Sequence, residues 1–269
     1  MSKIFSAQNW NSLSEQYQCA EPFPSICIDN FLTEEFATRV ASAYPEYEDA
    51  KKVGREFNAT NESLKVQITE PPLFPSPVAE LSDALSSKEF IEIMSKLSGI
   101  ESLVWDPSFV GGGMHLTKSS GLLDVHVDFN FESKLDLFRR INILIYLNPV
   151  WDKTWGGEVE LWDKEVKNCI QSFEPKFNRC VIFSTSDISF HGVTAVQSPS
   201  YISRNSFAAY YYSSEPGDNA GDLYGGNHTT IFKARPYEYK KKYVTMPMES
   251  FKKTLQQKKR SLKKVLVGK

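Results

Sequence analysis

The stretch LLDVHVDFN, residues 122–130, alternates apolar and polar residues with a period of two. Such alternation is typical of a β-strand, in which residues i and i+2 point to the same face. Asp124, His126 and Asp128 are therefore expected on one face of the strand. The opposite face is apolar and is expected to pack in the core, with Leu123, Val125 and Val127. An imidazole beside a carboxylate on one face provides two corners of a metal site.

The chain from about Val104 onward keeps this period of two. Four further segments alternate or are rich in β-branched and aromatic residues: INILIYLN (141–148), GGEVELW (156–162), RCVIFSTS (179–186) and RNSFAAYYYS (204–213). Turn pairs such as Asn-Pro and Gly-Gly separate the segments. Many short strands without intervening helices predict a mainly β chain with flanking helices, whose core is an antiparallel sandwich or jelly roll.

The first hundred residues have a different pattern, mixed and mostly helical. A helix is expected over 33–45, where Thr33 is a suitable N-cap. A second apolar stripe predicts helix over 76–99, broken near Ser86 and Ser87. Residues 50–77 between them are polar and contain prolines, so we expect a loop there.

The chain is divided by these patterns into three regions. Residues 1–100 form a helical support, 101–213 the β core, and 214–269 a loop followed by a basic C-terminal helix. That last helix, from Met248 to Lys269, has an apolar face and no acidic residue after Glu249. We interpret it as a solvated docking helix, with an arm for an anionic partner as the alternative.

Composition narrows the class of protein. The chain has 269 residues with 41% hydrophobic residues and a formal net charge of −2, so a sizeable core is expected and neither nucleic acid nor an anionic membrane is favoured as a partner. Its four cysteines are too scattered for a disulfide framework. The N-terminus has no apolar signal-like run. A soluble cytoplasmic protein is expected, and no oligomeric state is predicted.

A catalytic metal needs a third ligand, and His191 is the best candidate. It follows the segment RCVIFSTS, so the sheet can wind round and bring it back to His126 and Asp128. Two histidines and one carboxylate are the facial triad of non-haem Fe(II) oxygenases, which leaves open coordination positions. His228, in GGNHTT, is expected to be a loop residue.

Arg204 indicates what would occupy those open positions. It begins a strand in which Ser206 shares its face, and an arginine aimed into an apolar barrel is costly unless an anion meets it. In the segment 141–148, Asn142 and Tyr146 also share one face, so the Tyr146 phenol can reach the same anion. A dianionic keto acid fits, because iron, Asp128, the acid and Arg204 then sum to zero charge.

Together these motifs resemble a known family. From Gly113 to Tyr212, the order HVD, IYLNPVWD, WGGEVELW, FEPKFNRCVIFSTSD, HGV and Arg204 is similar to the prolyl-4-hydroxylase-like branch of the 2-oxoglutarate/Fe(II) dioxygenases, and especially to the hypoxia-type prolyl hydroxylases. The segments 1–100 and 214–269 carry no such resemblance. The gap from His191 to Arg204 is longer than in the hypoxia-type enzymes, and the strand entering HVD has one extra residue.

The resemblance implies a double-stranded β-helix with Fe(II) at one mouth and 2-oxoglutarate and O2 as co-substrates. His126, Asp128 and His191 match the iron ligands. Positions matching co-substrate contacts are Arg204 for the distal carboxylate, Tyr146 in support of it, Val193 as an apolar contact, and His115 in the pocket, with Ser206 and Asn142 beside them. Substrate contacts are expected just past the ligands and at the rim: Phe129, Asn130, Arg139, Arg140 and Trp155.

The implied activity is hydroxylation of an unactivated C–H bond of a prolyl or proline-like substrate, coupled to decarboxylation of 2-oxoglutarate to succinate and CO2. Because Asp128 is a carboxylate and not a small residue, hydroxylation is favoured over halogenation. Alternatives are oxidation of another small molecule, such as an amino acid, sugar or natural-product intermediate, or a non-catalytic metal-binding jelly roll. A nucleic-acid demethylase ranks last, since Tyr210 occupies the position of a second arginine in such relatives. Residues 50–77 or the Gly225-Gly226 segment are candidate lids.

Overall fold

The computed structural model describes residues 3–217 and 223–248. Its helices are α1 (Trp10–Gln18), α2 (Glu34–Ser42), α3 (Tyr47–Val53), α4 (Ser76–Ser86) and α5 (Lys88–Ser98), with the short turns η1 (Pro71–Leu73), η2 (Lys153–Trp155) and η3 (Lys241–Thr245). Its strands are β1 (Ser25–Ile28), β2 (Arg55–Ala59), β3 (Glu62–Ile68), β4 (Val104–Trp105), β5 (Gly113–Val127), β6 (Phe131–Glu132), β7 (Leu137–Tyr146), β8 (Val159–Trp162), β9 (Cys169–Phe173), β10 (Cys180–Ser184), β11 (His191–Val193), β12 (Arg204–Ser213) and β13 (Ile231–Phe232).

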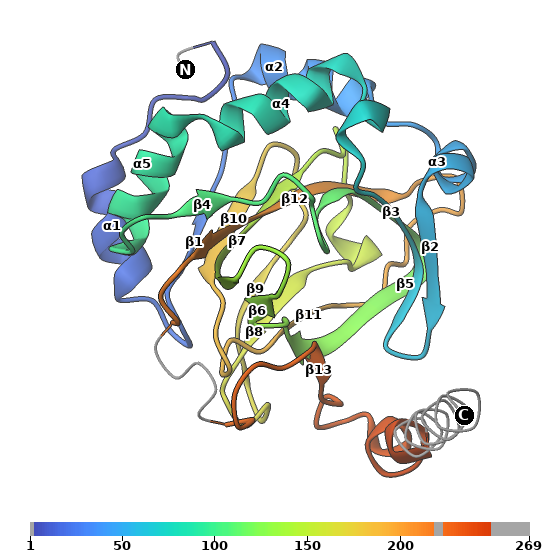
Figure 1. The fold of residues 1–269 in the computed structure, drawn as a ribbon. Helices are drawn as coiled ribbons and strands as arrows, with labels where there is room; N and C mark the ends of the chain where they lie inside the picture. Colours follow the sequence, from blue (N-terminus) through green and yellow to red (C-terminus); the bar gives the residue numbers. More distant parts are fainter. Residues whose placement is uncertain (1–2, 218–222, 249–269) are drawn as a thin grey trace, which may run out of the picture.

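The strands form one antiparallel sheet that folds over on itself. Its main order is β1-β10-β7-β12-β5-β11-β8-β9. The long strand β5 belongs to both halves, because residues up to Thr117 pair with β12 and residues from Leu123 pair with β11. Between them Ser120 has a φ of 69°, and a Cβ on Gly121 would come within 2.5 Å of the Thr117 side chain. The bend at these two residues turns one sheet into the two facing sheets of a jelly roll, as the sequence predicts (Figure 1).

Alternation along β7 and β12 separates the helix side of the sheet from its interior. Ile141, Ile143 and Ile145 belong to the large apolar core that the helices complete. The intervening residues of β7, Asn142 and Leu144, line the interior cavity instead. In Figure 1 the helices arch over one side of the barrel, and the cavity lies on the other face of the sheet, where Asn142 and Leu144 point.

The two helical predictions are confirmed in position. Helix α2 runs over residues 34–42 with Thr33 at its N-cap, although the Thr33 hydroxyl donates to the carbonyl of Lys3 and caps no helical N–H. The predicted break in the second stripe lies at Ser87, whose side chain accepts a hydrogen bond from the N–H of Phe90 and starts α5. The helical stripe therefore becomes two helices that meet at a serine cap.

The expectation of a loop over residues 50–77 is wrong. This stretch contains the end of α3 and a hairpin made of β2 and β3, which we call the β2–β3 hairpin (residues 55–68). Strand β3 pairs with β5 over both halves of that strand and so extends the barrel sheet. The stretch is polar because β2 is largely exposed and several side chains of β3 line a polar cavity, so composition alone conceals the strands.

The segment after residue 223 is fastened to the barrel by a buried ionic cluster. Arg235 donates to Glu160 at 2.7 Å and lies 3.6 Å from Asp124, and Lys241 contacts Asp124 at 2.6 Å. Strand β13 pairs with the end of β5. The predicted helix over 248–269 lies outside the described residues, apart from Met248. Among the helices that the structure describes, none is long and apolar enough to cross a membrane.

Candidate metal and co-substrate site

His126, Asp128 and His191 converge at one point of the barrel. His126 Nε2 lies 3.5 Å from Asp128 Oδ1, and His191 Nε2 lies 3.8 Å from Asp128 Oδ2. One ligand atom from each of the three residues lies within 4.8 Å of the others. Strands β5 and β11 pair His126 directly with His191, so the two imidazoles are neighbours across the sheet.

Hydrogen bonds fix the orientation of both imidazoles. His126 Nδ1 lies 2.8 Å from the carbonyl of Asp124, and His191 Nδ1 lies 2.9 Å from the carbonyl of Ser189. A carbonyl only accepts, so each Nδ1 carries a proton, and in a neutral ring of this tautomer Nε2 presents its lone pair. Burial, with the neighbouring His126, lowers the pKa of His191 to about 4. Both features keep His191 in the neutral form that a metal requires.

Asp128 is ionised, and its two oxygens lie close to both imidazoles and to Arg139. Burial alone would raise its pKa, but Arg139, at 3.3 Å from Asp128 Oδ2, and the two histidines hold the pKa well below the usual value. Asp128 Oδ2 accepts no hydrogen bond from any residue that the structure describes. A buried carboxylate with an unsatisfied oxygen facing two imidazole lone pairs fits Fe(II), which accepts two nitrogens and one oxygen on one face.

Asp124 departs from the expected strand face. Between His191 and Val193 the register with β5 shifts, because Val193 pairs with Leu123 while His191 pairs with His126. This bulge breaks the simple alternation, so Leu123 lines the cavity and Asp124 points to the ionic cluster with Arg235. Asp124 nonetheless supports the site through its backbone carbonyl.

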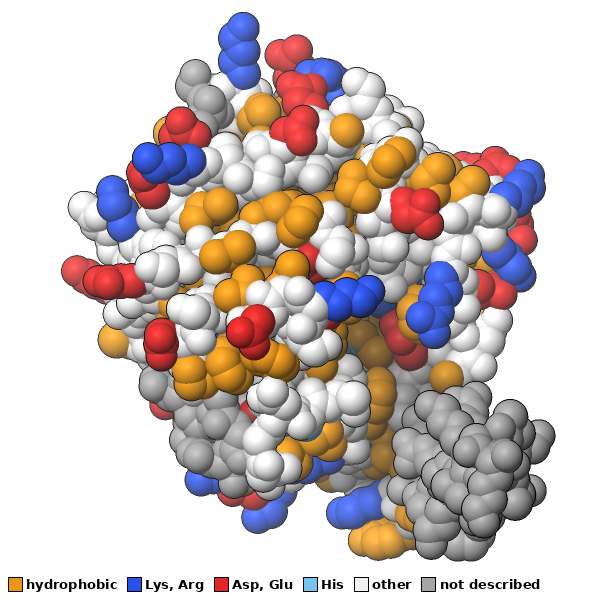
Figure 2. Space-filling model, viewed as in Figure 1, with side chains coloured by type: hydrophobic (Ala, Val, Ile, Leu, Met, Phe, Trp, Pro, Cys, Tyr) orange, Lys and Arg blue, Asp and Glu red, His pale blue; other side chains and the backbone are white. Residues whose placement is uncertain are grey.

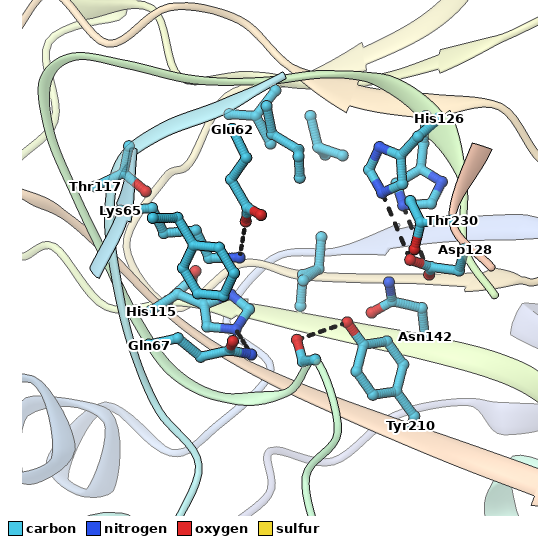
Figure 3. A pocket seen from close by; sticks show the side chains of 18 of the residues that line it. Glu62, Lys65, Gln67, His115, Thr117, His126, Asp128, Asn142, Tyr210 and Thr230 are labelled. Atoms are coloured by element: carbon cyan, nitrogen blue, oxygen red, sulfur yellow. Dashed lines mark hydrogen bonds and ion pairs between the residues drawn. The ribbon is translucent and has the colours of Figure 1, made fainter. Parts of the chain in front are cut away.

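The three residues open onto a cavity of about 410 Å³. Figure 2 shows the recess on this face of the molecule, with charged side chains at its edge. Figure 3 shows His126 and Asp128 on one side of the cavity and Glu62, Lys65 and His115 on the other. Of the sequence-predicted co-substrate residues, those that line the cavity are Arg204, Ser206, Val193, His115 and Asn142.

Arg204 is buried in the wall of this cavity and is held by neighbouring groups. Its Nε donates to the carbonyl of Gly157 at 2.7 Å, and its Nη1 lies 3.4 Å from the Ser206 hydroxyl. Gly157 has a φ of 77°, and a Cβ there would come within 2.9 Å of the Arg204 side chain. The glycine pair in WGGEVELW is thus more than a turn, because Gly157 leaves room for the arginine.

Two buried donors, Arg204 Nη2 and the Tyr146 hydroxyl, have no hydrogen-bond partner within the described residues. Tyr146 is absent from the cavity lining, but its ring lies 4.8 Å from the Arg204 guanidinium carbon. Burial raises the Tyr146 pKa to about 12, so its phenol remains a donor. Buried donors without partners are rare in folded proteins, and here they match an anion such as a carboxylate.

Register places these side chains in one row across four strands. Ser206 on β12 pairs with Tyr146 on β7 and with His115 on β5, and His115 pairs with Gln67 on β3. Gln67 Nε2 lies 3.1 Å from His115 Nε2 and donates to the carbonyl of Gly112 at 2.8 Å. Burial, then Lys65 and Arg204, hold the His115 pKa well below its usual value. His115 is therefore a neutral member of the cavity wall.

Two of the predicted substrate residues lie at the cavity, and they are stacked together. The Arg139 guanidinium carbon lies 3.7 Å from the ring centre of Phe129 and 3.7 Å from that of Tyr210. Arg139 Nη2 also donates to the carbonyl of Val110 at 2.6 Å. This layered arrangement forms a rigid shelf beside Asp128.

The other three predicted substrate residues lie away from the cavity. Asn130 uses its side chain to connect Asp187, Gly226 and the N–H of His228. Arg140 alternates with Arg139 along β7 and turns to Ser213 and Glu215. Trp155 packs against Trp151 with ring centres 5.5 Å apart. Sequence distance from the ligands was a poor guide, because strand alternation and local loop packing decide which side chains reach the cavity.

Sequence reasoning missed two further parts of the cavity wall. The β2–β3 hairpin contributes Arg55, Phe57, Glu62, Lys65 and Gln67. The segment leading into β13 contributes Thr230 and Phe232, and the Phe232 ring lies 5.3 Å from that of His126. The alternation of Glu62-Ser-Leu-Lys-Val-Gln-Ile was the signal for β3, but its polar residues masked it. His228, expected in a loop, lies in one and contacts Asp187 at 3.0 Å.

A match to a protein-family model indicates which metal the three converging ligands fit. Residues 112–212 match the model of the 2OG-Fe(II) oxygenase superfamily. This segment contains the three converging ligands together with Arg204. Residues 112–212 are similar to a 2OG-Fe(II) oxygenase domain. Iron(II) and 2-oxoglutarate are accordingly the metal and co-substrate that its residues fit.

Two curated relatives share part of this domain. Prolyl 3-hydroxylase OGFOD1 of Mus musculus is 37% identical over 78 residues, which cover 28% of this chain and 14% of the relative. The protein of the same name from Xenopus laevis is 34% identical over 64 residues, covering 22% of this chain and 12% of the relative. The chain thus matches less than one sixth of the length of these relatives.

Solved structures extend the likeness to most of the fold. A prolyl hydroxylase of Trichoplax adhaerens, in complex with a hypoxia-inducible-factor peptide, has a TM-score of 0.54 at 18% identity, over 77% of this chain and 94% of that one. A Pseudomonas putida prolyl-4-hydroxylase has a TM-score of 0.54 at 13% identity, over 76% and 98%. At these identities the likeness concerns the fold, and it confirms the predicted double-stranded β-helix.

Proposed function

We propose that the protein is an Fe(II)- and 2-oxoglutarate-dependent dioxygenase that hydroxylates a prolyl or proline-like substrate. The observation that carries the proposal is the pairing, in one cavity, of the His126, Asp128 and His191 triad with a buried arginine that keeps a donor free. A metal site alone would not need Arg204 in the same cavity. An anion site alone would not need neutral histidines oriented toward a carboxylate.

The residues divide the work of binding between them. His126, Asp128 and His191 would hold the iron. Arg204 would hold the distal carboxylate of 2-oxoglutarate with support from the Tyr146 hydroxyl behind it, since both have a donor without a partner among the described residues. Iron and 2-oxoglutarate would supply the oxidant, with O2 giving one atom to the hydroxylated carbon and one to succinate as CO2 is released.

The protein itself contributes orientation, charge balance and exclusion of water. Apolar residues close the metal end of the cavity, among them Leu123, Val159 and Phe232. Arg139 stabilises the ionised form of Asp128 and is itself locked between Phe129 and Tyr210. A bound substrate would meet this shelf next to the metal ligands, where an N–H group of the guanidinium can meet a carbonyl oxygen.

A proline-type substrate is supported by the likeness of the domain to prolyl hydroxylases. The identity of 34–37% to the two prolyl 3-hydroxylase segments falls on part of the chain. The cavity of about 410 Å³ also suits a pyrrolidine ring beside a keto acid.

The test measures substrate hydroxylation and its ratio to succinate formation. The full-length protein with Fe(II), 2-oxoglutarate and O2 would be incubated with a panel of proline-containing peptides and free imino acids, while succinate and the substrate mass are measured. We expect one oxygen atom gained per succinate formed, and no product from Asp128→Ala. Metal-bound protein that decarboxylates no 2-oxoglutarate with any member of the panel, or that oxidises only substrates without proline, would contradict the proposal.

A further inference from the structure

The cavity wall opposite the metal ligands contains an ion pair that the proposed reaction leaves without a role. Lys65 Nζ lies 2.8 Å from Glu62 Oε1, and the two side chains are only 12% and 17% exposed. Both residues belong to β3 and both line the cavity. Figure 3 shows the pair across the cavity from His126 and Asp128. Burying two charges beside a ligand site is costly unless they contribute to it.

Strand register places each member of the pair in the same row as a residue assigned to 2-oxoglutarate, with one β5 residue between them. Lys65 pairs with Thr117 on β5, and Thr117 pairs with Arg204 on β12. Glu62 pairs with Leu123 on β5, and Leu123 pairs with Val193 on β11. Directly opposed residues point to the same face of a sheet. Lys65 is thus in the same row as Arg204, about 10 Å away at two strand spacings.

Two long cationic side chains at this separation can meet above Thr117, the small residue between them. Burial first, and Lys65 and Arg204 next, disfavour the charged form of His115 in the adjacent row, which agrees with both cations facing the same part of the cavity. Phe57 supports the lysine from the other side, with its ring centre 5.5 Å from Lys65 Nζ.

Arg204 by itself leaves the recognition of a carboxylate incomplete. Its Nε is taken by the Gly157 carbonyl, so the usual two-pronged contact through Nε and Nη2 is not available. Within the described wall, Arg204 Nη2 is the guanidinium nitrogen without a partner. A carboxylate has two oxygens with about four acceptor positions, so there is room for a further charged donor.

We propose that Lys65 is a second cationic contact for the distal carboxylate of 2-oxoglutarate, and that Glu62 holds its ammonium group until the co-substrate replaces it. This inference rests on the proposed function, because it assumes the same keto acid in the same cavity. Lys65 exchanges one carboxylate partner for another, so its charge is compensated both before and after binding. Glu62 is then a competitor of the co-substrate.

The proposal predicts effects of opposite sign for the two partners. Under anaerobic conditions, 2-oxoglutarate would be titrated into the Fe(II)-loaded full-length protein while the visible metal-to-ligand absorption is recorded. Lys65→Met should raise the Kd of 2-oxoglutarate about tenfold, as expected for loss of a charge-assisted hydrogen bond. Glu62→Gln should lower the Kd about threefold, because the competing carboxylate is removed while the lysine remains.

The double variant separates direct contact from simple charge balance. If Lys65 contacts the co-substrate, Glu62→Gln combined with Lys65→Met should still bind 2-oxoglutarate more weakly than the wild type. If the lysine only neutralises Glu62, the double variant should bind like the wild type, and the proposal is wrong. Lys65→Arg should recover most of the affinity in the first case.

A matched control is available in Lys52 and Asp49, which form an ion pair of the same spacing at 2.6 Å on the exposed surface of α3. Lys52→Met should leave the Kd unchanged. A keto acid without a distal carboxylate, 2-oxopentanoate, serves as the second control, because its weaker binding should be indifferent to Lys65→Met. An equal loss for both acids would indicate a general structural defect and overturn the proposal.

The same titration distinguishes failure of this inference from failure of the proposed function. If the wild type binds Fe(II) and 2-oxoglutarate but Lys65→Met has the wild-type Kd, only the role of Lys65 is refuted. If the folded wild type gives no absorption band with 2-oxoglutarate at all, the proposed function fails and takes this inference with it.

Discussion

Two walls of one cavity differ in how their side chains are held. The metal wall, made of the end of β5, the start of β11 and the start of β12, has its functional groups fixed by backbone carbonyls at 2.7–2.9 Å. The hairpin wall, made of the β2–β3 hairpin, has a half-exposed outer strand and side chains that pair mainly with each other. Groups that must bind a metal in one geometry lie on inner strands, and adjustable charges lie on the edge.

The largest difference between the two walls should appear when a metal ligand is removed. His126→Ala takes away one of three protein ligands, and the two that remain should not retain the ion at micromolar concentration. We expect loss of Fe(II) binding and a fall in turnover of at least 1,000-fold, on the order of 4 kcal/mol in the transition state. Metal content after gel filtration and succinate formation measure both. Retention of stoichiometric iron would show that the metal wall is assigned incorrectly.

The metal wall should also depend on the ionic cluster behind it. Arg235→Met leaves Glu160 buried without its partner at 2.7 Å, which should cost about 3 kcal/mol in the free energy of unfolding. Arg179→Met is the control, because it breaks a similarly short contact with Asp29 near the surface and should cost about 1 kcal/mol or less. Urea unfolding of the metal-free protein measures both. Equal decreases in the free energy of unfolding for the two variants would show that burial of the cluster does not add to its contribution to stability.

Removal of the arginine anchor should weaken the co-substrate without removing the metal. Arg204→Met deletes the buried cation, and we expect the Kd of 2-oxoglutarate to rise about 100-fold. Fe(II) binding should stay within about twofold of the wild type, since Arg204 contacts none of the three ligands among its described hydrogen bonds. Anaerobic titration and metal analysis test the two halves of this expectation. An equal loss of Fe(II) binding would contradict the separate assignment of the metal ligands and the co-substrate anchor.

The smallest effect is expected where the two walls meet, at His115. Because its pKa in the folded protein lies well below 6.5, folded His115 stays neutral while the unfolded chain takes up a proton below that pH. Stability is therefore full above pH 6.5 and falls as the pH drops, by at most about 1.4 kcal/mol per pH unit from this group. His115→Gln should flatten the decline in unfolding free energy between pH 6.5 and 5. Identical slopes in the two proteins would place His115 in a solvated environment.

The metal wall could be predicted from the sequence because its signals are local and rigid. Alternation in HVDFN and in the strand from Arg204 specifies faces of strands that are buried on both sides. The bulge that moved Asp124 off its face could not be predicted, because it depends on the pairing of β5 with β11. Arg140 and Asn130 were wrongly predicted to contact substrate for a related reason. Their nearness to the metal ligands in sequence does not determine where their side chains point.

The hairpin wall was not predicted because its two strands contain few apolar residues. Residues 50–77 show few apolar positions, and only Val66 and Ile68 of β3 join the main core. The row that connects Lys65 to Arg204 exists only once β3 has paired with β5. Segments that complete a polar cavity at a sheet edge therefore need tertiary structure to be recognised.

One cavity is predicted to take both iron and 2-oxoglutarate. Metal-free protein would be loaded anaerobically with Fe(II) and then titrated with 2-oxoglutarate, beside His126→Ala and Arg204→Met. We predict a weak visible band that saturates at one equivalent in the wild type, is absent in His126→Ala, and needs about 100-fold more keto acid in Arg204→Met. A folded wild-type protein that gives no band, or variants that give the same band at the same concentration, would contradict the central claim.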